Sequence, residues 1–276
     1  MKIDGKILAA EVLKNLKKRV EKLKEKKIIP KLYIITLNQN PETSSYVKQK
    51  LLKAEEIGAK VSILKLDNNT KTAELLEIIK KLNKNKNVHG IIVQRPLPKK
   101  IDEEKIALGI NPEKDVDGLN PRSKFSVPVT LAVIKIIDFI SEDENILEFL
   151  KTKKITVIGK GVTAGKPIIK LLQKLKLNLN VIDSKTENKE KILKSSDIII
   201  SAVGKPRIIS SKNIKKGVIL IGVGIHMEKD NKLHGDYDEN DIEKKASFYT
   251  PTPGGVGPLN VAMLLKNLIE ASENSL

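Results

Sequence analysis

The sequence predicts an α/β protein of two domains, each with a parallel sheet whose strands are joined by helices. Short runs rich in Ile, Val and Leu alternate with longer stretches of helical periodicity, which is typical of strand–helix–strand units. The alternation occurs in two blocks, and a stretch rich in Pro, Asn, Asp and Gly, 111–128, separates them. The length of 276 residues also suits two domains, because a domain averages ~150 residues.

The first block begins with an amphipathic helix within 1–27, whose acids and interrupted apolar spacing distinguish it from a signal peptide. Strands are expected at 32–37, 60–66 and 88–94, with helices at 41–58 and 72–84 between them. Gln94 ends the third strand, just before Pro96 and Pro98. Open α/β sheets place ligands beyond the carboxyl ends of their strands, so Gln94 is either a site residue or an ordinary polar strand end.

The second block begins with a helix at 129–140. Strands follow at 154–159, 179–183, 197–204 and 217–225, with helical stretches between most of them. The last apolar stretch is expected to form a helix that returns to the first domain. The predicted domains are residues 1–120 plus 259–276 and residues 121–258, with a ligand cleft between them, because domain interfaces are favoured ligand sites.

The composition excludes several classes of function. The chain has no Cys, which excludes disulfides, thiolate catalysis and Cys-ligated zinc and suits a reducing cytoplasm. No run of about 18 apolar residues is present, so no membrane span is expected. The net charge of +17 fits an anionic partner. Because the lysines are dispersed among acids and aromatic residues make up only 3%, small anionic ligands are favoured over nucleic acid.

A glycine-rich turn lies in the first strand–helix unit of the second domain. Gly159, Gly161 and Gly165 follow an apolar strand and precede a helix with Pro167 in its first turn. Glycines at such a turn let phosphate approach the backbone, and the N-terminus of a helix attracts anions. The spacing is one residue longer than the common dinucleotide fingerprint. The pattern favours a Rossmann-like nucleotide domain over an ordinary tight turn.

The next strand ends in Asp183, Ser184 and Lys185, where dinucleotide-binding domains contact the adenosine ribose. An acid at that position favours the 2′-hydroxyl of NAD. A hydroxyl and cations, including Lys160 in the glycine turn, favour the 2′-phosphate of NADP. These residues alone leave both cofactors open.

Tyr46 and Lys50 lie four residues apart, on one face of the helix expected at 41–58. A tyrosine hydroxyl beside an ammonium can share a proton, and partial burial lowers a lysine pKa toward the working range of an acid–base group. Tyr and Lys are also common on helix surfaces. The same spacing marks short-chain dehydrogenases, but there it follows the nucleotide turn, whereas here it precedes that turn.

Two acids and a bare turn complete the set of candidates. Asp115 and Asp117 alternate, so on an extended backbone only one would face the cleft. No carboxylate cluster accompanies them, and the three His residues, at 89, 226 and 234, are isolated, so no metal is expected.

The stretch 251–258 consists largely of Pro and Gly, which indicates either a helix-entry turn or a stiff, bare wall beside a ligand.

Taken together, these motifs resemble one family, the bifunctional methylenetetrahydrofolate dehydrogenase/cyclohydrolase (FolD) family. They occur in one order over nearly the whole chain: DGK (4–6), YVKQK (46–50), AEEIG (54–58), GIIVQ (90–94) and PLP (96–98), KDVDG (114–118), the glycine turn, AVGKP (202–206), VGI (223–225), GD (235–236) and PGGVGP (253–258). The resemblance implies two reactions of one-carbon metabolism at one cleft. A hydride passes from 5,10-methylenetetrahydrofolate to a nicotinamide cofactor, and water then opens the methenyl product to 10-formyltetrahydrofolate.

The resemblance also implies roles for individual residues. Lys50 is the implied acid–base group, with Tyr46 orienting the folate, Gln94 hydrogen-bonding Lys50 and Asp117 binding the polar edge of the pterin. Further folate contacts are implied at Pro253, Gly254, Gly255 and Val256. The implied cofactor contacts are Gly159, Lys160, Gly161, Gly165, Ser184, Lys185 and Ile225. The implied cofactor is NADP, with NAD not excluded and no metal, and the implied assembly is a cytoplasmic homodimer formed through the nucleotide domain.

The chain departs from the family pattern at three places. The family has Gly-Arg-Ser in the glycine turn where this chain has Gly159-Lys160-Gly161, and it has His where this chain has Asp183. The connection after Pro121 is also shorter and lacks the Cys of the family. Two alternatives therefore stay open: a monofunctional NAD(P)-dependent dehydrogenase of the same fold and a basic α/β protein that binds nucleic acid.

Overall fold

The computed structural model describes residues 1–37, 41–142, 144–228 and 232–275. The chain divides into two compact units. Unit 1 comprises Met1–Ala9 and Val129–Asn260, and unit 2 comprises Ala10–Pro128 and Val261–Leu276. Each unit contains a parallel sheet with helices packed against it, so the predicted two-domain α/β fold class is confirmed.

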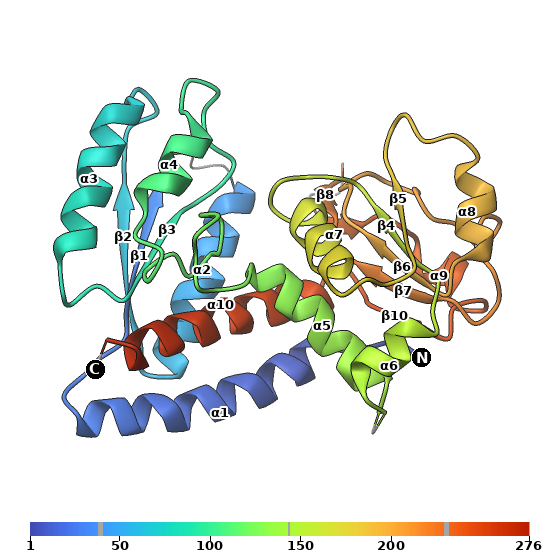
Figure 1. Ribbon diagram of the computed structural model, residues 1–276, viewed down its shortest axis with the longest axis horizontal. Helices are drawn as coiled ribbons and strands as arrows, with labels where there is room; N and C mark the ends of the chain where they lie inside the picture. Colours follow the sequence, from blue (N-terminus) through green and yellow to red (C-terminus); the bar gives the residue numbers. More distant parts are fainter. Residues whose placement is uncertain (38–40, 143, 229–231, 276) are drawn as a thin grey trace. The chain divides into compact units, whose positions relative to one another are not determined.

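Unit 2 is built on a three-stranded parallel sheet with the order β2-β1-β3 (Figure 1). Its strands are β1 (Lys31–Thr36), β2 (Lys60–Lys65) and β3 (Gly90–Val93). Its helices are α2 (Pro41–Glu56), α3 (Thr72–Lys84), α4 (Glu103–Gly109) and most of α1 (Gly5–Glu25) and α10 (Val256–Glu273). The side chains of Ile34 and Ile35 in the central strand have no exposed surface. Such continuous branched aliphatic runs are typical of parallel strands covered on both faces.

Helix α3 shows how local sequence determines an element of unit 2. Leu75 and Ile79 lie four residues apart on one face and are fully buried, as expected for an amphipathic helix. At the start of the helix, the Glu74 side chain accepts a hydrogen bond from the Lys71 backbone N–H at 3.1 Å. This contact satisfies one of the N–H groups that a helix start leaves unpaired. The predicted and observed bounds of this helix agree.

The last helix packs within unit 2, as the sequence predicts. Arg19 of α1 forms an ion pair with Glu273 of α10, in which Nε donates to Oε1 at 2.9 Å. A Cβ placed on Gly90 would lie 2.9 Å from a methyl carbon of Leu268. The absence of a side chain at the start of β3 therefore lets α10 approach the sheet closely.

Unit 1 contains a five-stranded parallel sheet with the order β10-β7-β6-β4-β5. Its strands are β4 (Ile155–Ile158), β5 (Leu179–Ile182), β6 (Ile198–Ser201), β7 (Ile219–Gly222) and β10 (Phe248–Tyr249). Its helices are α5 (Pro128–Ile140), α6 (Ile146–Lys151), α7 (Gly165–Lys174), α8 (Lys189–Ser195) and α9 (Glu239–Ile242). The strand order reverses between β4 and β6, and open α/β sheets bind ligands at such a switch point.

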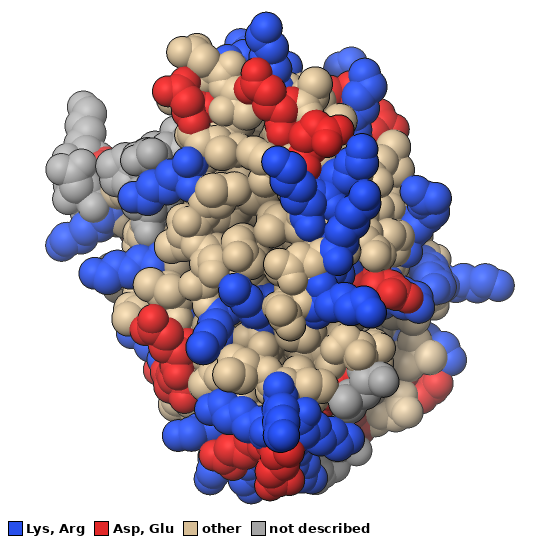
Figure 2. Space-filling model, turned by 90° about the vertical axis from the view of Figure 1, so that its left-hand side faces the viewer, with Lys and Arg blue, Asp and Glu red and all other residues tan. Residues whose placement is uncertain are grey.

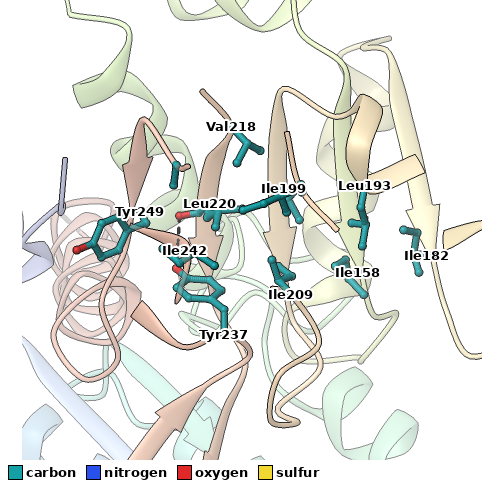
Figure 3. Packing of buried hydrophobic residues seen from close by; sticks show 12 residues of the cluster. Ile158, Ile182, Leu193, Ile199, Ile209, Val218, Leu220, Tyr237, Ile242 and Tyr249 are labelled. Atoms are coloured by element: carbon teal, nitrogen blue, oxygen red, sulfur yellow. Dashed lines mark hydrogen bonds between the residues drawn. The ribbon is translucent and has the colours of Figure 1, made fainter. Parts of the chain in front are cut away.

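The core of unit 1 gathers apolar side chains from the whole sheet. Figure 3 shows Ile158, Ile199 and Leu220 projecting from neighbouring strands, with Tyr237 beside them. The Tyr237 hydroxyl donates a 2.6 Å hydrogen bond to the Thr250 carbonyl, so burying this ring leaves no unpaired polar group. The same burial raises the pKa of the hydroxyl.

The strand predicted at 217–225 was wrong at its carboxyl end. Strand β7 ends at Gly222, and Ile225 begins a separate strand, β8 (Ile225–Met227), which pairs antiparallel with β9 (Leu233–Gly235). Both Val223 and Gly224 donate their N–H groups to the Ser201 carbonyl. This shared acceptor bends the chain out of the sheet directly after β7, although the apolar run continues.

The surface carries its charge in dispersed form. Figure 2 shows Lys and Arg side chains spread over one face of the molecule, with acidic side chains between them. Such interspersed charges are typical of a solvated surface. Among the described residues, no helix is long and apolar enough to cross a membrane.

Candidate active site and nucleotide site

A buried lysine marks the candidate active site of unit 2. Lys50 lies on α2, and only 6% of its surface is exposed. Its Nζ donates a 2.8 Å hydrogen bond to Oε1 of Gln94 and lies 5.8 Å from the centre of the Tyr46 ring. The structure thus brings together three of the four residues that the family resemblance implied for catalysis.

The position of Gln94 follows from the sheet. Gln94 comes directly after β3, and its backbone N–H still bonds to the Ile35 carbonyl of β1 at 2.8 Å. Its side-chain Nε2 donates to the Arg95 carbonyl at 3.0 Å. That bond leaves Oε1 facing Lys50, so the amide can accept from the lysine without adding a charge.

Burial determines the protonation of Lys50. Desolvation lowers the pKa of its ammonium, and the negative charge of Asp117 opposes that shift. The amide of Gln94 contributes no charge that would hold the proton. A lysine in these surroundings is closer to a neutral amine, which can act as a base, than an exposed lysine is.

Asp115 and Asp117 have different environments. Asp115 is 1% exposed, and its Oδ2 accepts the Asn120 N–H at 2.7 Å, whereas Oδ1 has no partner among the described residues. Burial raises the pKa of Asp115 to about 6. Asp117 is half-buried, and both residues line one small cavity together with Arg95. Asp117 is thus the more accessible of the two acids.

Two residues that the sequence analysis did not select hold the KDVDG segment in place. Lys114 donates its Nζ to the carbonyls of Asn83 and Asn85, at 2.8 and 2.7 Å, at the carboxyl end of α3. Asn267 of α10 is buried, and its Nδ2 donates to the Val116 carbonyl at 2.9 Å. The signal for Asn267 was an uncharged polar residue, next to Lys266, inside the apolar run VAMLLKNLI.

The glycine turn of unit 1 has the geometry of a dinucleotide site. Gly159 has φ +95°, which favours glycine. Gly165 begins α7, and a Cβ there would lie 2.1 Å from the Gly159 carbonyl oxygen. A Cβ on Gly161 would meet no atom within 4 Å. The three glycines therefore serve the tight turn, the open approach and the close helix packing that this fingerprint requires.

The end of β5 lies beside that turn. Lys160 and Asp183 form an ion pair, with Nζ 2.7 Å from Oδ2. Lys160, with the hydrogen bonds from the Lys185 N–H and the Thr186 hydroxyl, lowers the pKa of Asp183 to about 2. Ser184 and Lys185 are exposed. The strand end thus presents an anion neutralised by one cation, with a hydroxyl and a second cation beside it.

The stretch 251–258 has an internal reason for its glycines. A Cβ on Gly255 would lie 2.6 Å from the Pro251 carbonyl oxygen. Across from it, a Cβ on Gly5 would lie 1.8 Å from the Gly255 oxygen. Gly254 has φ +107° and more room. Gly254, Gly255 and Val256 are buried and Pro253 is exposed. The Pro251 carbonyl of the same turn therefore already requires glycine at position 255, and the Gly255 oxygen requires glycine at position 5.

The other implied cofactor contact is Ile225, whose side chain is 41% exposed at the start of β8. A Cβ on Gly204 would lie 2.8 Å from the Ile225 carbonyl oxygen, which places Ile225 against the loop that follows β6. Among the described residues, no group of three or more His, Asp or Glu side chains could hold a metal ion.

The fold and these sites define a class: an α/β enzyme with a dinucleotide-binding unit and a second unit that carries a buried lysine. Comparison with known families makes this specific. Residues 3–117 match the model of the tetrahydrofolate dehydrogenase/cyclohydrolase catalytic domain, and residues 131–276 match that of its NAD(P)-binding domain. The chain belongs to the tetrahydrofolate dehydrogenase/cyclohydrolase family.

Individual relatives agree with this assignment over the full length. The bifunctional protein FolD of Macrococcus caseolyticus is 39% identical over 282 residues, covering 99% of this chain and 98% of the relative. A FolD crystal structure from Campylobacter jejuni superposes with a TM-score of 0.93 at 35% identity, covering 100% of this chain and 99% of that one. The Trypanosoma brucei enzyme, solved with NADP and an inhibitor, gives a TM-score of 0.92 at 29% identity, covering 100% and 98%.

Proposed function

We propose that this chain catalyses both reactions of its family. It oxidises 5,10-methylenetetrahydrofolate to the methenyl compound with NADP and then hydrolyses that compound to 10-formyltetrahydrofolate. The observation that carries this proposal is the buried Lys50, with its lowered pKa and its neutral partner Gln94 at 2.8 Å. Hydrolysis of the methenyl cation needs a base, and burial beside an uncharged partner lowers the pKa of Lys50 toward that role.

Lys50 would act in both proton transfers of the hydrolysis. As water adds to the methenyl carbon, the neutral amine takes a proton from it. As the bond from that carbon to N5 of the folate breaks, the resulting ammonium gives a proton to N5. The remaining hydroxyl proton is released as the formyl group forms, so one proton leaves per turnover. Gln94 keeps Nζ in place without raising its pKa.

The remaining residues of the site would bind and orient the folate. Tyr46 lies beside Lys50 and would stack against the folate rings. Asp117 would accept hydrogen bonds from the polar edge of the pterin. We extend this proposal to the folate contacts at Pro253, Gly254, Gly255 and Val256.

The nucleotide site of unit 1 fits NADP. Gly161 leaves the backbone open, and α7 begins without a side-chain cap on its N-terminal N–H groups, which suits a pyrophosphate. Lys160, Ser184 and Lys185 would hold the 2′-phosphate, and Ile225 and the three glycines would contact the rest of the dinucleotide. NADP, when bound, supplies the acceptor for the hydride.

The test is an assay of the purified chain with methylenetetrahydrofolate and either NADP or NAD. Reduced cofactor and the methenyl compound are followed separately, and we expect reduction without methenyl accumulation. In Lys50→Met, we expect hydrolysis to fall by a factor on the order of 10³ while cofactor reduction continues and the methenyl compound accumulates. Unchanged hydrolysis in that variant would refute the role of Lys50. Reduction with accumulation in the wild type would indicate a monofunctional dehydrogenase.

We also propose that the chain forms a homodimer in a reducing cytoplasm. The family resemblance supports the dimer, and the Cys-free sequence suits the compartment. The proposed domain ranges are residues 1–120 plus 259–276 for the folate domain and 121–258 for the nucleotide domain. Sedimentation equilibrium of the full chain tests the dimer, and a single species of monomer mass would contradict it.

A further inference from the structure

Two motifs that no step above uses, AVGKP (202–206) and GD (235–236), bind each other in the structure. Asp236 is fully buried. Its Oδ2 accepts from the Ser201 hydroxyl at 2.5 Å and from the Val203 N–H at 3.0 Å, and its Oδ1 accepts from the Lys205 N–H at 2.9 Å. One carboxylate thus receives three donors from the end of β6 and the loop that follows it.

Neighbouring backbone segments approach this loop closely. A Cβ on Gly224 would lie 2.4 Å from both Asp236 Oδ2 and the Gly204 nitrogen. Gly204 itself has φ +69°, and a Cβ there would lie 2.8 Å from the Ile225 carbonyl oxygen. The chain segments after β6, β7 and β9 therefore meet around a single carboxylate.

The loop held by Asp236 faces the glycine turn. Strands β4 and β6 are neighbours in the sheet, and they form the switch point where such sheets bind dinucleotides. A Cβ on Gly159 would lie 2.6 Å from the Ala202 carbonyl oxygen. Any movement of residues 202–205 would therefore change the width of the site beside the glycine turn.

We propose that Asp236 is a positioning residue for dinucleotide binding. It touches no cofactor itself; it fixes the loop 202–205 at the distance from Gly159 that the dinucleotide needs. A carboxylate is the suitable group because both its oxygens only accept, and both face backbone N–H groups. The inference rests on the proposed function only in that the chain binds a nicotinamide dinucleotide.

The decisive variant is Asp236→Asn in the full chain. The amide keeps the shape but has one acceptor oxygen, so it turns a donor toward either Val203 or Lys205 and leaves that N–H unpaired. We expect the Kd for NADP and for NAD, measured by titration calorimetry, to rise about tenfold or more. Hydrolysis of methenyltetrahydrofolate without any dinucleotide should stay at the wild-type rate.

Ser196→Ala is the matched control. Ser196 is fully buried at the opposite end of the same strand, and its hydroxyl lies 2.7 Å from that of Thr156. Its loss removes a buried hydrogen bond from the same sheet, so we expect lower thermal stability with an unchanged dinucleotide Kd. If Asp236→Asn also loses stability but binds dinucleotide as the wild type does, Asp236 is only structural and the proposal is wrong.

Ser201→Ala keeps the experiment decisive if Asp236→Asn does not fold. It removes one of the three donors and leaves both backbone bonds, so we expect a dinucleotide Kd about threefold above that of Ser196→Ala. Equal Kd values in these two variants would overturn the proposal. A wild type that binds dinucleotide but does not oxidise methylenetetrahydrofolate would refute the proposed function alone.

Discussion

Two lysines of this chain have hydrogen-bonding partners at nearly the same distance and yet differ in character. Lys50 lies 2.8 Å from the amide of Gln94, and Lys160 lies 2.7 Å from the carboxylate of Asp183. Lys50 is 6% exposed, whereas the side chain of Lys160 is 55% exposed. The comparison teaches that burial and the charge of the partner, rather than the hydrogen bond, decide what a lysine can do.

The chemical consequence follows from these surroundings. In unit 2, a low dielectric and an uncharged partner favour the neutral amine, which can accept a proton. In unit 1, Lys160 is exposed beside an anionic partner, where its charge can attract a phosphate. We therefore propose that the same residue type serves proton transfer at one site and charge recognition at the other.

Replacing each lysine by arginine separates the two roles, and the largest effect is expected at Lys50. Arginine stays charged at any pH that the protein tolerates, so Lys50→Arg cannot take a proton from water. We expect cyclohydrolase activity to fall by a factor on the order of 10³, measured as methenyl consumption. Lys53→Arg, an exposed change on the same helix, is the control and should keep wild-type activity. A Lys50→Arg enzyme with more than a tenth of wild-type hydrolysis would contradict the base assignment.

Asp115 provides a second test of burial, with the opposite sign. Its folded pKa of about 6 exceeds the ordinary value of 3.8, so between these two pH values the folded state holds more protons than the unfolded state. Stability must then fall as pH rises through this window. The shift corresponds to a loss on the order of 2–3 kcal/mol, and Asp115→Asn should remove it.

Urea unfolding on both sides of that pH window measures the effect. We expect the free energy of unfolding of Asp115→Asn to change less between the two conditions than that of the wild type. Glu113→Gln, an exposed acid two residues away, should follow the wild type. If Asp115→Asn shows the wild-type pH dependence, the carboxyl is not desolvated, and the same argument for Lys50 is weakened.

The sequence was sufficient to predict helices and strands where the local apolar pattern agrees with the burial of those residues in the fold. The helix 72–84 and the strands β1 to β6 were predicted within one or two residues of most ends, because apolar periodicity and burial coincide there. The strand predicted at 197–204 ends three residues earlier, at Ser201, and the two-residue strand β10 was not predicted. The run 217–225 was misjudged because it stays apolar through a bend that Ser201 determines from another strand. Nothing in the local pattern of that run indicates where its hydrogen-bond partner lies.

The candidate site residues also divide into those that the sequence could indicate and those that only the folded chain reveals. The Lys50–Gln94 contact was expected from family motifs, but neither spacing nor periodicity could indicate it across 44 positions. Lys114 and Asp236 were not selected as individual site residues, because their importance comes from backbone groups that converge on them only in the folded chain. For Gly255, the sequence suggested a ligand contact, whereas the nearby Pro251 carbonyl also requires glycine at this position.

A change at Asp183, the ion-pair partner of Lys160 in unit 1, is expected to have a smaller effect, which falls on the preference between NADP and NAD. Asp183 is anionic at neutral pH, since its pKa is about 2, and it would repel a 2′-phosphate that approaches the strand end. We expect Asp183→Asn to raise the ratio of kcat/KM for NADP over NAD about tenfold, measured with both cofactors. Asp241→Asn, which removes another anion of the same unit, should leave the ratio unchanged. An unchanged ratio in Asp183→Asn would place the ribose away from this strand end.

The smallest effect is expected when Lys160 becomes arginine. We treat Lys160 as an exposed positive charge. The guanidinium of an arginine at this position keeps that charge and adds a second hydrogen-bond donor toward Asp183 or a phosphate. We expect KM for NADP to change by less than about threefold, whereas Lys160→Ala should raise it severalfold and in a salt-dependent way. A tenfold rise of KM for NADP in Lys160→Arg would mean that the compact ammonium itself is required. The roles of Lys50 and Lys160 would then differ less than their exposure indicates. An Arg variant near wild type, beside an inactive Lys50→Arg, would establish that one substitution distinguishes charge from proton transfer in this enzyme.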